Sequence, residues 1–286
     1  MRLVKFRREG RVGQGFVEGG RIFVAGGWSD LSPGDAPFDL PSRDRAALEA
    51  ARAAASEELA LEEVTLLAPV APTAKVICLG VNYREHAEEV NQETGDCPPL
   101  FAKYPDTLAG HEQSITRPLV SDTFDFEGEI AIVIGRPGRH IPRETAMDHV
   151  LGYSCLMDGS IREYQSHSPT AGKNFHGSSA MGPWIVTADE IGDASAISLV
   201  TRLNGAVVQS ATSADMIFDI PTAIAYISRW TPLRSGDVIS MGTPAGVGLG
   251  RTPPLWMKPG DTIEVDLSGI GRLRTSVVDE QRQREG

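Results

Sequence analysis

The sequence predicts an α+β protein in which β-structure dominates, with a small N-terminal β-rich domain over residues 1–70 and a larger domain over residues 71–286. Short apolar segments alternate with loops rich in glycine and proline along most of the chain, as is typical of strands. Few segments carry helix-forming residues over the length of a helix, and no regular strand–helix–strand repeat occurs, which argues against a doubly wound parallel sheet. We therefore expect the larger domain to be a mixed, closed or rolled β-structure.

Composition and charge exclude several classes of protein. The 286 residues are 41% hydrophobic and 23% charged, with a mean hydropathy of -0.15, which suits a folded chain with a sizeable core. The formal net charge of -11 argues against nucleic acid as a partner, because phosphate backbones are bound by positive surfaces. No apolar run approaches the roughly 20 residues of a membrane helix, so we expect no membrane partner. The N-terminus lacks the apolar segment of a signal peptide, and three cysteines without metal-binding spacing favour a reducing, cytoplasmic compartment.

The N-terminal domain should combine short strands with one helix. A helix is expected over Arg45–Leu61, which is rich in Ala, Glu and Leu; it should begin near Pro41–Ser42 with Asp44 in its first turn. The proline-spaced segment Leu66–Thr73 is expected to link the two domains, with the boundary near residue 70. Glycine punctuation at Gly19–Gly20 separates the last two of three expected strands: Leu3–Phe6, Gln14–Val17 and Ile22–Ala25.

The larger domain should contain only a few helices. One is expected over Tyr83–Val90 and another should open at Pro221, since proline is favoured in the first turn of a helix. The strongest apolar segments predict strands at Val76–Leu79, Ile130–Ile134, Val150–Met157, Asp237–Met241, Thr262–Leu267 and Arg272–Val278.

Three carboxylates with a period of two precede one of these strands. In the segment TFDFEGEIAIVIG, Asp125, Glu127 and Glu129 would share one face of an extended chain, because residues two apart point to the same side. The alternative is the solvated face of an amphipathic strand. However, Ile130–Ile134 is apolar on both faces, as in a buried strand, and carboxylates beside a core repel one another unless a cation bridges them.

A further carboxylate completes a candidate metal site. Asp158 ends the apolar run Val150–Met157, although an aspartate in that position can also be a turn or cap residue. Together with Glu127 and Glu129 it would supply an all-oxygen ligand set, which suits Mg²⁺ or Mn²⁺, with Ca²⁺ as an alternative, rather than zinc.

A candidate base and a candidate buried cation lie elsewhere in the chain. If Tyr83–Val90 is helical, His86 and Glu89 share a face, so the carboxylate can orient the imidazole; a surface helix with a solvated acidic face is the alternative. Lys173 is flanked by glycine and aromatic residues, which favours a buried cation near substrate over an ordinary surface charge. The glycine cluster GTPAGVGLG is followed by Thr-Pro-Pro instead of a helix, so it predicts a backbone-lined loop bordering the site rather than a dinucleotide fold.

The ordered motifs resemble those of the fumarylacetoacetate hydrolase family over roughly Lys75–Val278. They are GVNYREHAEEV, FDFEGEIAIVIG, MDGSIREYQ, AGKNFHGSSAMGPW, LNG, MIFDIP and SGDVISMGTPAGVG. The resemblance implies a β-roll or mixed β-sandwich catalytic fold, Mg²⁺ or Mn²⁺ dependence and a homodimer. It implies the same metal ligands (Glu127, Glu129, Asp158), dyad (His86, Glu89) and lysine (Lys173) that the residues indicate. It adds Arg162, Gln165 and Thr243 as substrate contacts, and an arginine suits a substrate carboxylate.

These residues lead to a hypothesis of function. The protein is expected to be a divalent-metal-dependent hydrolase that cleaves a carbon–carbon bond in a small anionic 2-oxo acid or 1,3-dicarbonyl substrate of the acylpyruvate type. His86, polarised by Glu89, would deprotonate the attacking water, and Lys173 would stabilise the oxyanion. The alternative is a decarboxylase or keto–enol isomerase of a 2-oxo dicarboxylate in the catabolism of aromatic compounds. A metal-containing ligand-binding protein without catalytic activity is a third alternative.

Overall fold

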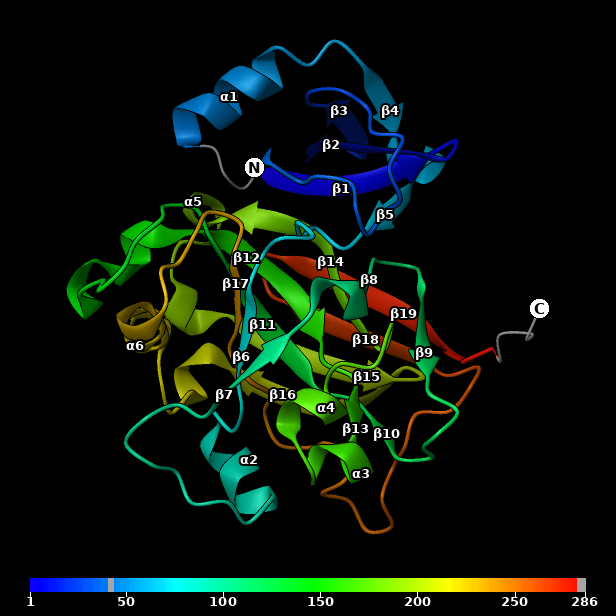
Figure 1. Ribbon diagram of the computed structural model, residues 1–286, viewed down its shortest axis with the longest axis vertical. Helices are drawn as coiled ribbons and strands as arrows, with labels where there is room; N and C mark the ends of the chain where they lie inside the picture. The colour runs from blue at the N-terminus through cyan, green and yellow to red at the C-terminus, as the bar shows by residue number, and fades with distance from the viewer. Residues whose placement is uncertain (41–43, 282–286) are drawn as a thin grey trace.

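The computed structural model describes residues 1–40 and 44–281. Its N-terminal part, blue in Figure 1, is an antiparallel sheet covered by one helix. In chain order this part contains β1 (Arg2–Arg8), β2 (Arg11–Glu18), β3 (Arg21–Val24), α1 (Arg45–Ala53), β4 (Glu58–Ala60), a 3-10 turn (Leu61–Glu63) and β5 (Thr65–Leu67). The three strands expected here from the sequence correspond to the first three strands in chain order, β1 to β3.

The larger part is built from many short strands, with α6 as its longest helix within the described residues. Its first half contains β6 (Val76–Leu79), α2 (Arg84–Glu89), β7 (Leu100–Lys103), β8 (Leu108–Ala109), β9 (Ser114–Arg117), β10 (Phe124–Asp125), β11 (Gly128–Ile134), a 3-10 segment (Arg143–His149), β12 (Val150–Met157) and β13 (Ser160–Ile161). Its second half contains α3 (Arg162–Gln165), α4 (Pro169–Gly172), β14 (Ser179–Thr187), α5 (Ala188–Ile191), β15 (Ser198–Leu203), β16 (Ala206–Thr212), α6 (Ile220–Trp230), β17 (Val238–Ser240), β18 (Thr262–Leu267) and β19 (Gly271–Asp279). Further 3-10 turns lie at Pro105–Thr107, Ala194–Ala196 and Ser213–Asp215.

Two large sheets organise the molecule. The 12-stranded sheet has the order β4-β3-β2-β1-β14-β12-β11-β17-β6-β7, with β5 beside β1 and β8 beside β14. It passes from the N-terminal part into the larger part where β1 pairs with β14, through Leu3 and Ile185. The second sheet has the order β16-β15-β18-β19-β9, and a separate ribbon joins β10 to β13. The protein is therefore an α+β fold in which β-structure dominates, as the sequence predicts.

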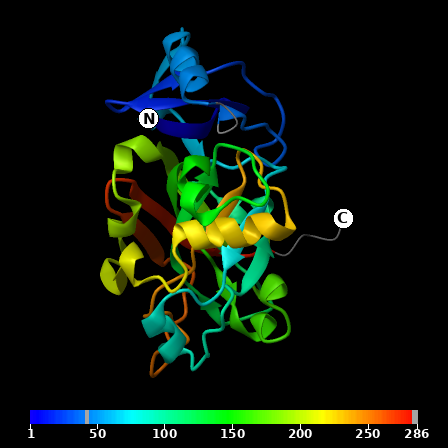
Figure 2. The same ribbon diagram turned by 90° about the vertical axis from the view of Figure 1, so that its left-hand side faces the viewer.

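The main hydrophobic core lies between the two sheets of the larger part. Strand β12 contacts β18 and β19 across it, and β11 contacts β15. All seven residues of β11 are buried, whereas β18 alternates between buried and half-buried residues, as expected for a central strand and for a strand with one face on the core. In Figure 2, α6 lies across the side of the larger part that faces the viewer. Its N-cap is Asp219, whose carboxylate accepts a hydrogen bond from the N–H of Thr222 at 2.9 Å.

The prediction of a helix from Arg45 to Leu61 is wrong in its second half. Helix α1 ends at Ala53, and the chain then forms β4, which pairs with β3. Pairing of β4 with β3 buries Leu59. The free energy gained by burying this side chain outweighs helix propensity, which contributes less than about 1 kcal/mol per residue.

The start of α1 also differs from the expectation. Asp44 is the N-cap rather than a residue of the first turn, and its carboxylate accepts a hydrogen bond from the N–H of Ala47 at 2.8 Å. The start expected at Pro41–Ser42 lies outside the described residues. The linker segment expected from Leu66 begins within β5, which pairs with β1, so its first residues belong to the sheet. Among residues 1–40 and 44–281, no helix has the length and apolar character needed to span a membrane.

Candidate active site

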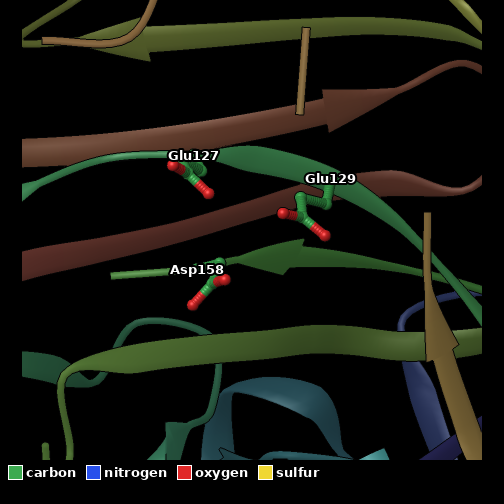
Figure 3. Close-up of side chains that lie close together, drawn as sticks. All are labelled: Glu127, Glu129 and Asp158. Atoms are coloured by element: carbon green, nitrogen blue, oxygen red, sulfur yellow. The ribbon is translucent and has the colours of Figure 1, made fainter. Parts of the chain in front are cut away.

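Three buried carboxylates meet where β11 and β12 lie side by side. Glu127 and Glu129 flank the start of β11, and Asp158 follows the end of β12 (Figure 3). The two segments are antiparallel neighbours, and the N–H of Asp158 donates to the carbonyl of Glu127 at 2.8 Å. One oxygen from each carboxylate lies within 4.8 Å of the others, and all three residues are at most 5% exposed. The grouping of these three residues predicted from the sequence is therefore present in the structure.

The carboxylate cluster has the donor chemistry of a hard divalent cation. Neither oxygen of Asp158 has a partner with hydrogen-bond geometry, although each lies within ion-pair distance of a buried lysine. Burial, and the negative charges of Asp158 and Glu127, raise the pKa of Glu129, because they disfavour a further negative charge in this cluster. Mg²⁺ and Mn²⁺ bind carboxylate oxygens of this kind, so Glu127, Glu129 and Asp158 are suited to hold such an ion.

Two buried lysines flank Asp158, one at each oxygen. The Nζ atom of Lys173 lies 3.0 Å from Oδ2 and also donates to Glu127, whereas the Nζ atom of Lys103 lies 2.8 Å from Oδ1. Burial disfavours the charged form of Lys173, but Asp158 and Glu127 outweigh burial and raise its pKa, so it is a cation. Lys173 is 1% exposed and lines the site, as expected from its surroundings in the sequence.

Lys103 was not found from the sequence. Its ammonium also donates to Ser179 Oγ at 2.9 Å and to the carbonyl of Lys173, so two hydrogen bonds hold it beside Asp158. The only signal in the sequence is a single lysine at the end of the apolar strand β7, and lysines of that kind are usually exposed. Its partners are between 55 and 76 residues away along the chain, so no spacing rule connects them.

Asp125 does not join the carboxylate cluster, contrary to the expectation that it shares a face with Glu127 and Glu129. The extended segment is interrupted, because β10 ends at Asp125 and pairs with β13 before β11 begins at Gly128. The carboxylate of Asp125 turns instead to the guanidinium of Arg162, with Nη2 at 2.7 Å and Nε at 2.8 Å from Oδ2. The interruption of the strand therefore gives Asp125 a different partner from its two neighbours.

Arg162 links this second carboxylate to the metal cluster. Its Nη2 lies 2.8 Å from Glu127 Oε1, and its Nη1 donates to Gln165 Oε1 at 2.7 Å. Burial disfavours the charged guanidinium, but Glu127 and Asp125 outweigh burial and raise its pKa. Burial would likewise raise the pKa of Glu127, but Lys173 and Arg162 outweigh it and hold that pKa below its usual range. The lowered pKa favours the ionised form of Glu127, whose two oxygens lie beside Arg162 and Lys173.

The expected histidine–glutamate pair is formed on α2. His86 Nδ1 lies 2.9 Å from Glu89 Oε2, and the other oxygen of Glu89 accepts the N–H of Gly246 at 2.9 Å. Burial would raise the pKa of Glu89, but the hydrogen bonds from His86 and Gly246 lower it. The glycine cluster is a loop beside the site, as predicted, and Arg251 braces it by donating to the carbonyl of Gly246 at 3.0 Å.

One cavity of about 400 Å³ brings the pair and the metal cluster together. Helices α2, α3 and α4 contribute lining residues, and they lie at the end of the larger part away from the N-terminal sheet (Figure 1). Five of the nine residues expected at the site line it: His86, Glu127, Gln165, Arg162 and Lys173.

The other expected residues lie behind this lining. Glu89 is hydrogen-bonded to His86, and Glu129 and Asp158 are the two members of the carboxylate cluster that do not line the cavity. Thr243 is buried, and its hydroxyl donates to the carbonyl of Gly128 at 3.0 Å and accepts from Gln209 at 2.7 Å. Thr243 is not among the residues that line the cavity, so its expected contact with substrate stays a prediction.

This fold and site define a class of β-rich protein with a buried carboxylate cluster suited to a divalent metal and a separate histidine–glutamate pair. The family described as Fumarylacetoacetate (FAA) hydrolase C-terminal matches residues 75–278, and the one described as Rv2993c-like, N-terminal matches residues 1–69. The chain belongs to the fumarylacetoacetate hydrolase family. This confirms the resemblance recognised in the sequence motifs.

Relatives in the family catalyse several reactions. The mitochondrial oxaloacetate tautomerase Fahd2a of Rattus norvegicus is 35% identical, with 97% of this chain and 92% of that protein covered. Fumarylacetoacetate hydrolase from Exiguobacterium antarcticum has a TM-score of 0.80 at 34% identity, over 98% of this chain and all of that one. The 2-hydroxyhepta-2,4-diene-1,7-dioate isomerase of Mycobacterium marinum has a TM-score of 0.77 at 31% identity, over 99% of this chain and all of that one. The chain is therefore related to enzymes along its whole length, and these enzymes differ in reaction.

Proposed function

We propose that the protein is a divalent-metal-dependent enzyme that interconverts the keto and enol forms of a small anionic 2-oxo acid. One observation carries the proposal: Glu127 of the carboxylate cluster and His86 of the His86–Glu89 pair line the same cavity. Enolisation needs these two functions, an electrophile at the carbonyl oxygen and a base beside the adjacent carbon. The oxaloacetate tautomerase relative, which is covered over 92% of its length, supports this reaction.

Different residues of the chain would bind the metal, transfer the proton and compensate the developing charge. A Mg²⁺ or Mn²⁺ ion held by Glu127, Glu129 and Asp158 would supply a Lewis acid that polarises the substrate carbonyl. His86 removes the proton from the carbon next to that carbonyl through Nε2, because Nδ1 is held by Glu89. The electron pair of the C–H bond becomes the C=C bond, and His86 delivers the proton to the carbonyl oxygen to give the enol. The reverse transfer gives the keto form. Lys173 and Arg162 compensate the negative charge that develops on the oxygen in this buried site.

Hydrolysis of a carbon–carbon bond, the activity expected from the sequence, is the second candidate. The cavity of about 400 Å³ has room for a longer acylpyruvate and a water molecule, and His86 would then deprotonate that water. The water oxygen would bond to the distal carbonyl carbon, and pyruvate would leave with the electron pair of the broken bond and a proton. Decarboxylation of a 2-oxo dicarboxylate would instead release CO₂ and a single organic product.

The test uses the purified protein with Mn²⁺, oxaloacetate and an acylpyruvate. Tautomerisation is measured as the loss of enol absorbance together with recovery of the intact acid, whereas two products indicate hydrolysis and CO₂ indicates decarboxylation. Glu127→Gln should abolish the metal-dependent rate, while Glu62→Gln, at an exposed glutamate, should not change it. Full turnover by the chelator-treated Glu127→Gln variant would refute a metal-dependent enzyme.

His86→Ala separates an enzyme from a metal-containing binding protein. The variant should bind Mn²⁺ normally and lose the rate, because the base acts on substrate and not on the ion. The control is His176→Ala, at an exposed histidine outside the cavity. If wild-type protein binds the metal and the acids but turns none of them over, the protein is a binding protein.

Assembly, compartment and pathway are further parts of the proposal. We infer a homodimer, which light scattering tests directly, and a cytoplasmic location, which the three free cysteines support. A place in the catabolism of aromatic compounds would require activity on ring-cleavage products, and the substrate panel should include one.

A further inference from the structure

The cavity lining combines a charged group with an apolar wall. Besides polar residues, it includes large apolar side chains from four places: the end of β6 with the segment after it, the C-terminal end of α2, β7, and the glycine loop. They are Leu79, Val81, Val90, Leu100, Phe101 and Leu249. The wall meets the charged group where the Nζ atom of Lys173 lies 5.3 Å from the ring centroid of Phe101. A substrate whose reacting end contacts the lysine therefore has its remaining atoms beside apolar side chains.

The cavity offers no free cation to a second carboxylate. Among the described residues, Arg162 and Lys173 are the only arginine and lysine that line it, and both are already paired with buried carboxylates. His86 also lines it, but its Nδ1 is held by Glu89. A carboxylate far from the reacting end would meet neutral donors such as Gln92 and Ser166 but no free cation to offset its loss of water, which is unfavourable.

The backbone at Leu249, one residue of the apolar wall, is held in place although the residue is exposed. Its side chain is 45% exposed, yet its N–H donates to Asp125 Oδ2 at 2.9 Å, and the N–H of Gly248 donates to Oδ1 at 2.7 Å. An anchored backbone that presents a leucine to a cavity suits contact with an apolar ligand group. Cavities of about 300–1,000 Å³ enclose ligands of drug size, so a four-carbon acid would leave much of this one unfilled.

We propose that the enzyme selects 2-oxo acids that carry an apolar tail, an alkyl or aryl group of several carbons beyond the reacting carbons, over dicarboxylates. The inference rests on the proposed function, because it takes the 2-oxo acid end to lie at the carboxylate cluster. The tail lies against the apolar wall, and Leu249 is a specificity-determining residue at its rim.

The test measures binding separately from turnover. N-alkyl oxamates carry the adjacent oxygens of a 2-oxo acid but do not enolise, so their Kd for the Mn²⁺-loaded protein can be measured by calorimetry. From N-methyl to N-butyl oxamate, Kd should fall about fourfold per methylene. N-(3-carboxypropyl) oxamate, of similar length, should bind at least tenfold more weakly than N-butyl oxamate. A flat series, or tighter binding of the carboxylated probe, would overturn the proposal.

Variants of Leu249 locate the effect on the wall. Leu249→Asp should abolish the dependence of Kd on tail length, and Leu249→Arg should reverse the preference in favour of the carboxylated probe. Leu119→Asp, at a leucine that is 50% exposed and outside the cavity, is the matched control and should keep the dependence. An unchanged dependence in both Leu249 variants would also overturn the proposal.

Turnover distinguishes this inference from the proposed function. Acylpyruvates of increasing length and oxaloacetate are assayed with Mn²⁺, and kcat/KM should rise with tail length. If oxaloacetate is the best substrate and the oxamate series is flat, only the selectivity is wrong. If no acid is turned over but Kd still falls with tail length, the proposed reaction fails while the selectivity of the cavity stands.

Discussion

The carboxylate of Asp125 holds the guanidinium of Arg162 in a buried ion pair, with Nη2 at 2.7 Å from Oδ2. The same carboxylate accepts the N–H groups of Gly248 and Leu249, so one side chain fixes both the arginine and the glycine loop. The loop in turn holds Glu89 through the N–H of Gly246. Asp125 therefore connects the two halves of the active site without contacting the cavity.

Asp125→Asn should disturb both halves. An amide keeps the shape but replaces one acceptor oxygen with an NH₂ group, which faces N–H donors and leaves the buried arginine less well paired. We expect KM for a 2-oxo acid to rise at least about tenfold, since a charged hydrogen bond contributes about 1.5–3 kcal/mol. Steady-state kinetics measure this change.

The control is the exposed ion pair between Arg11 and Asp30, in which Nε lies 3.0 Å from Oδ1. Asp30→Asn should leave KM and Tm nearly unchanged, because exposed pairs contribute little. Equal KM values for Asp125→Asn and wild type would contradict the role assigned to Asp125.

Lys103→Met should make the stability of the fold depend more strongly on a bound metal ion. Removing a buried ammonium leaves Asp158 with less compensation and should lower stability by about 3–5 kcal/mol. A divalent ion restores positive charge to the same cluster, so saturating Mn²⁺ should raise Tm more in this variant than in wild type. Differential scanning calorimetry with and without Mn²⁺ measures the two increments. Lys258→Met, at an exposed lysine, should give the wild-type increment, and an equal increment in Lys103→Met would count against the prediction.

Gly250→Ala should separate Glu89 from its partners. A Cβ atom at this position would lie 2.4 Å from Glu89 Oε1, and that carboxylate is held on both sides by His86 and Gly246. We expect kcat to fall by about 100-fold, the lower end of what general acid–base catalysis contributes, with Mn²⁺ affinity unchanged. Gly27→Ala, where a Cβ meets nothing within 4 Å, is the control. Normal kcat in Gly250→Ala would show that the glycine does not protect the pair.

Lys5 should give stability a distinctive dependence on pH. Its ammonium is 3% exposed and donates to the carbonyls of Pro33 at 3.0 Å and Ala36 at 2.8 Å, and burial lowers its pKa to about 8. The unfolded chain, with a pKa near 10.5, binds more protons between pH 8 and 10.5, so this lysine's contribution to stability rises with pH across that window. The penalty for burying the charged Lys5 ammonium reaches its full value below pH 8, and it is at most about 3 kcal/mol.

The measurement compares wild type with Lys5→Met from pH 7 to pH 10. Subtracting the variant removes the titration of tyrosines and cysteines, which also changes stability at alkaline pH. The difference in free energy of unfolding, wild type minus variant, should increase with pH. A constant difference would mean that the pKa of Lys5 is not lowered.

The sequence by itself determined the β-rich class, the family and two local pairs of the candidate site. Glu127 and Glu129 are two residues apart beside an apolar strand, and His86 and Glu89 are three apart on a helix, so local geometry fixes how each pair points. Such pairs can be predicted because their spacing follows the repeat of one element.

Only the tertiary structure decided the contacts between distant elements. Lys103 reaches Asp158 from 55 residues away, and Asp125 turns from its neighbours to Arg162 because β10 pairs with β13. The second half of the expected helix after Arg45 became β4 because an edge of the sheet was available to it. Charge pairing and strand pairing depend on which segments become neighbours in space, and the spacing of residues along one chain does not contain that information.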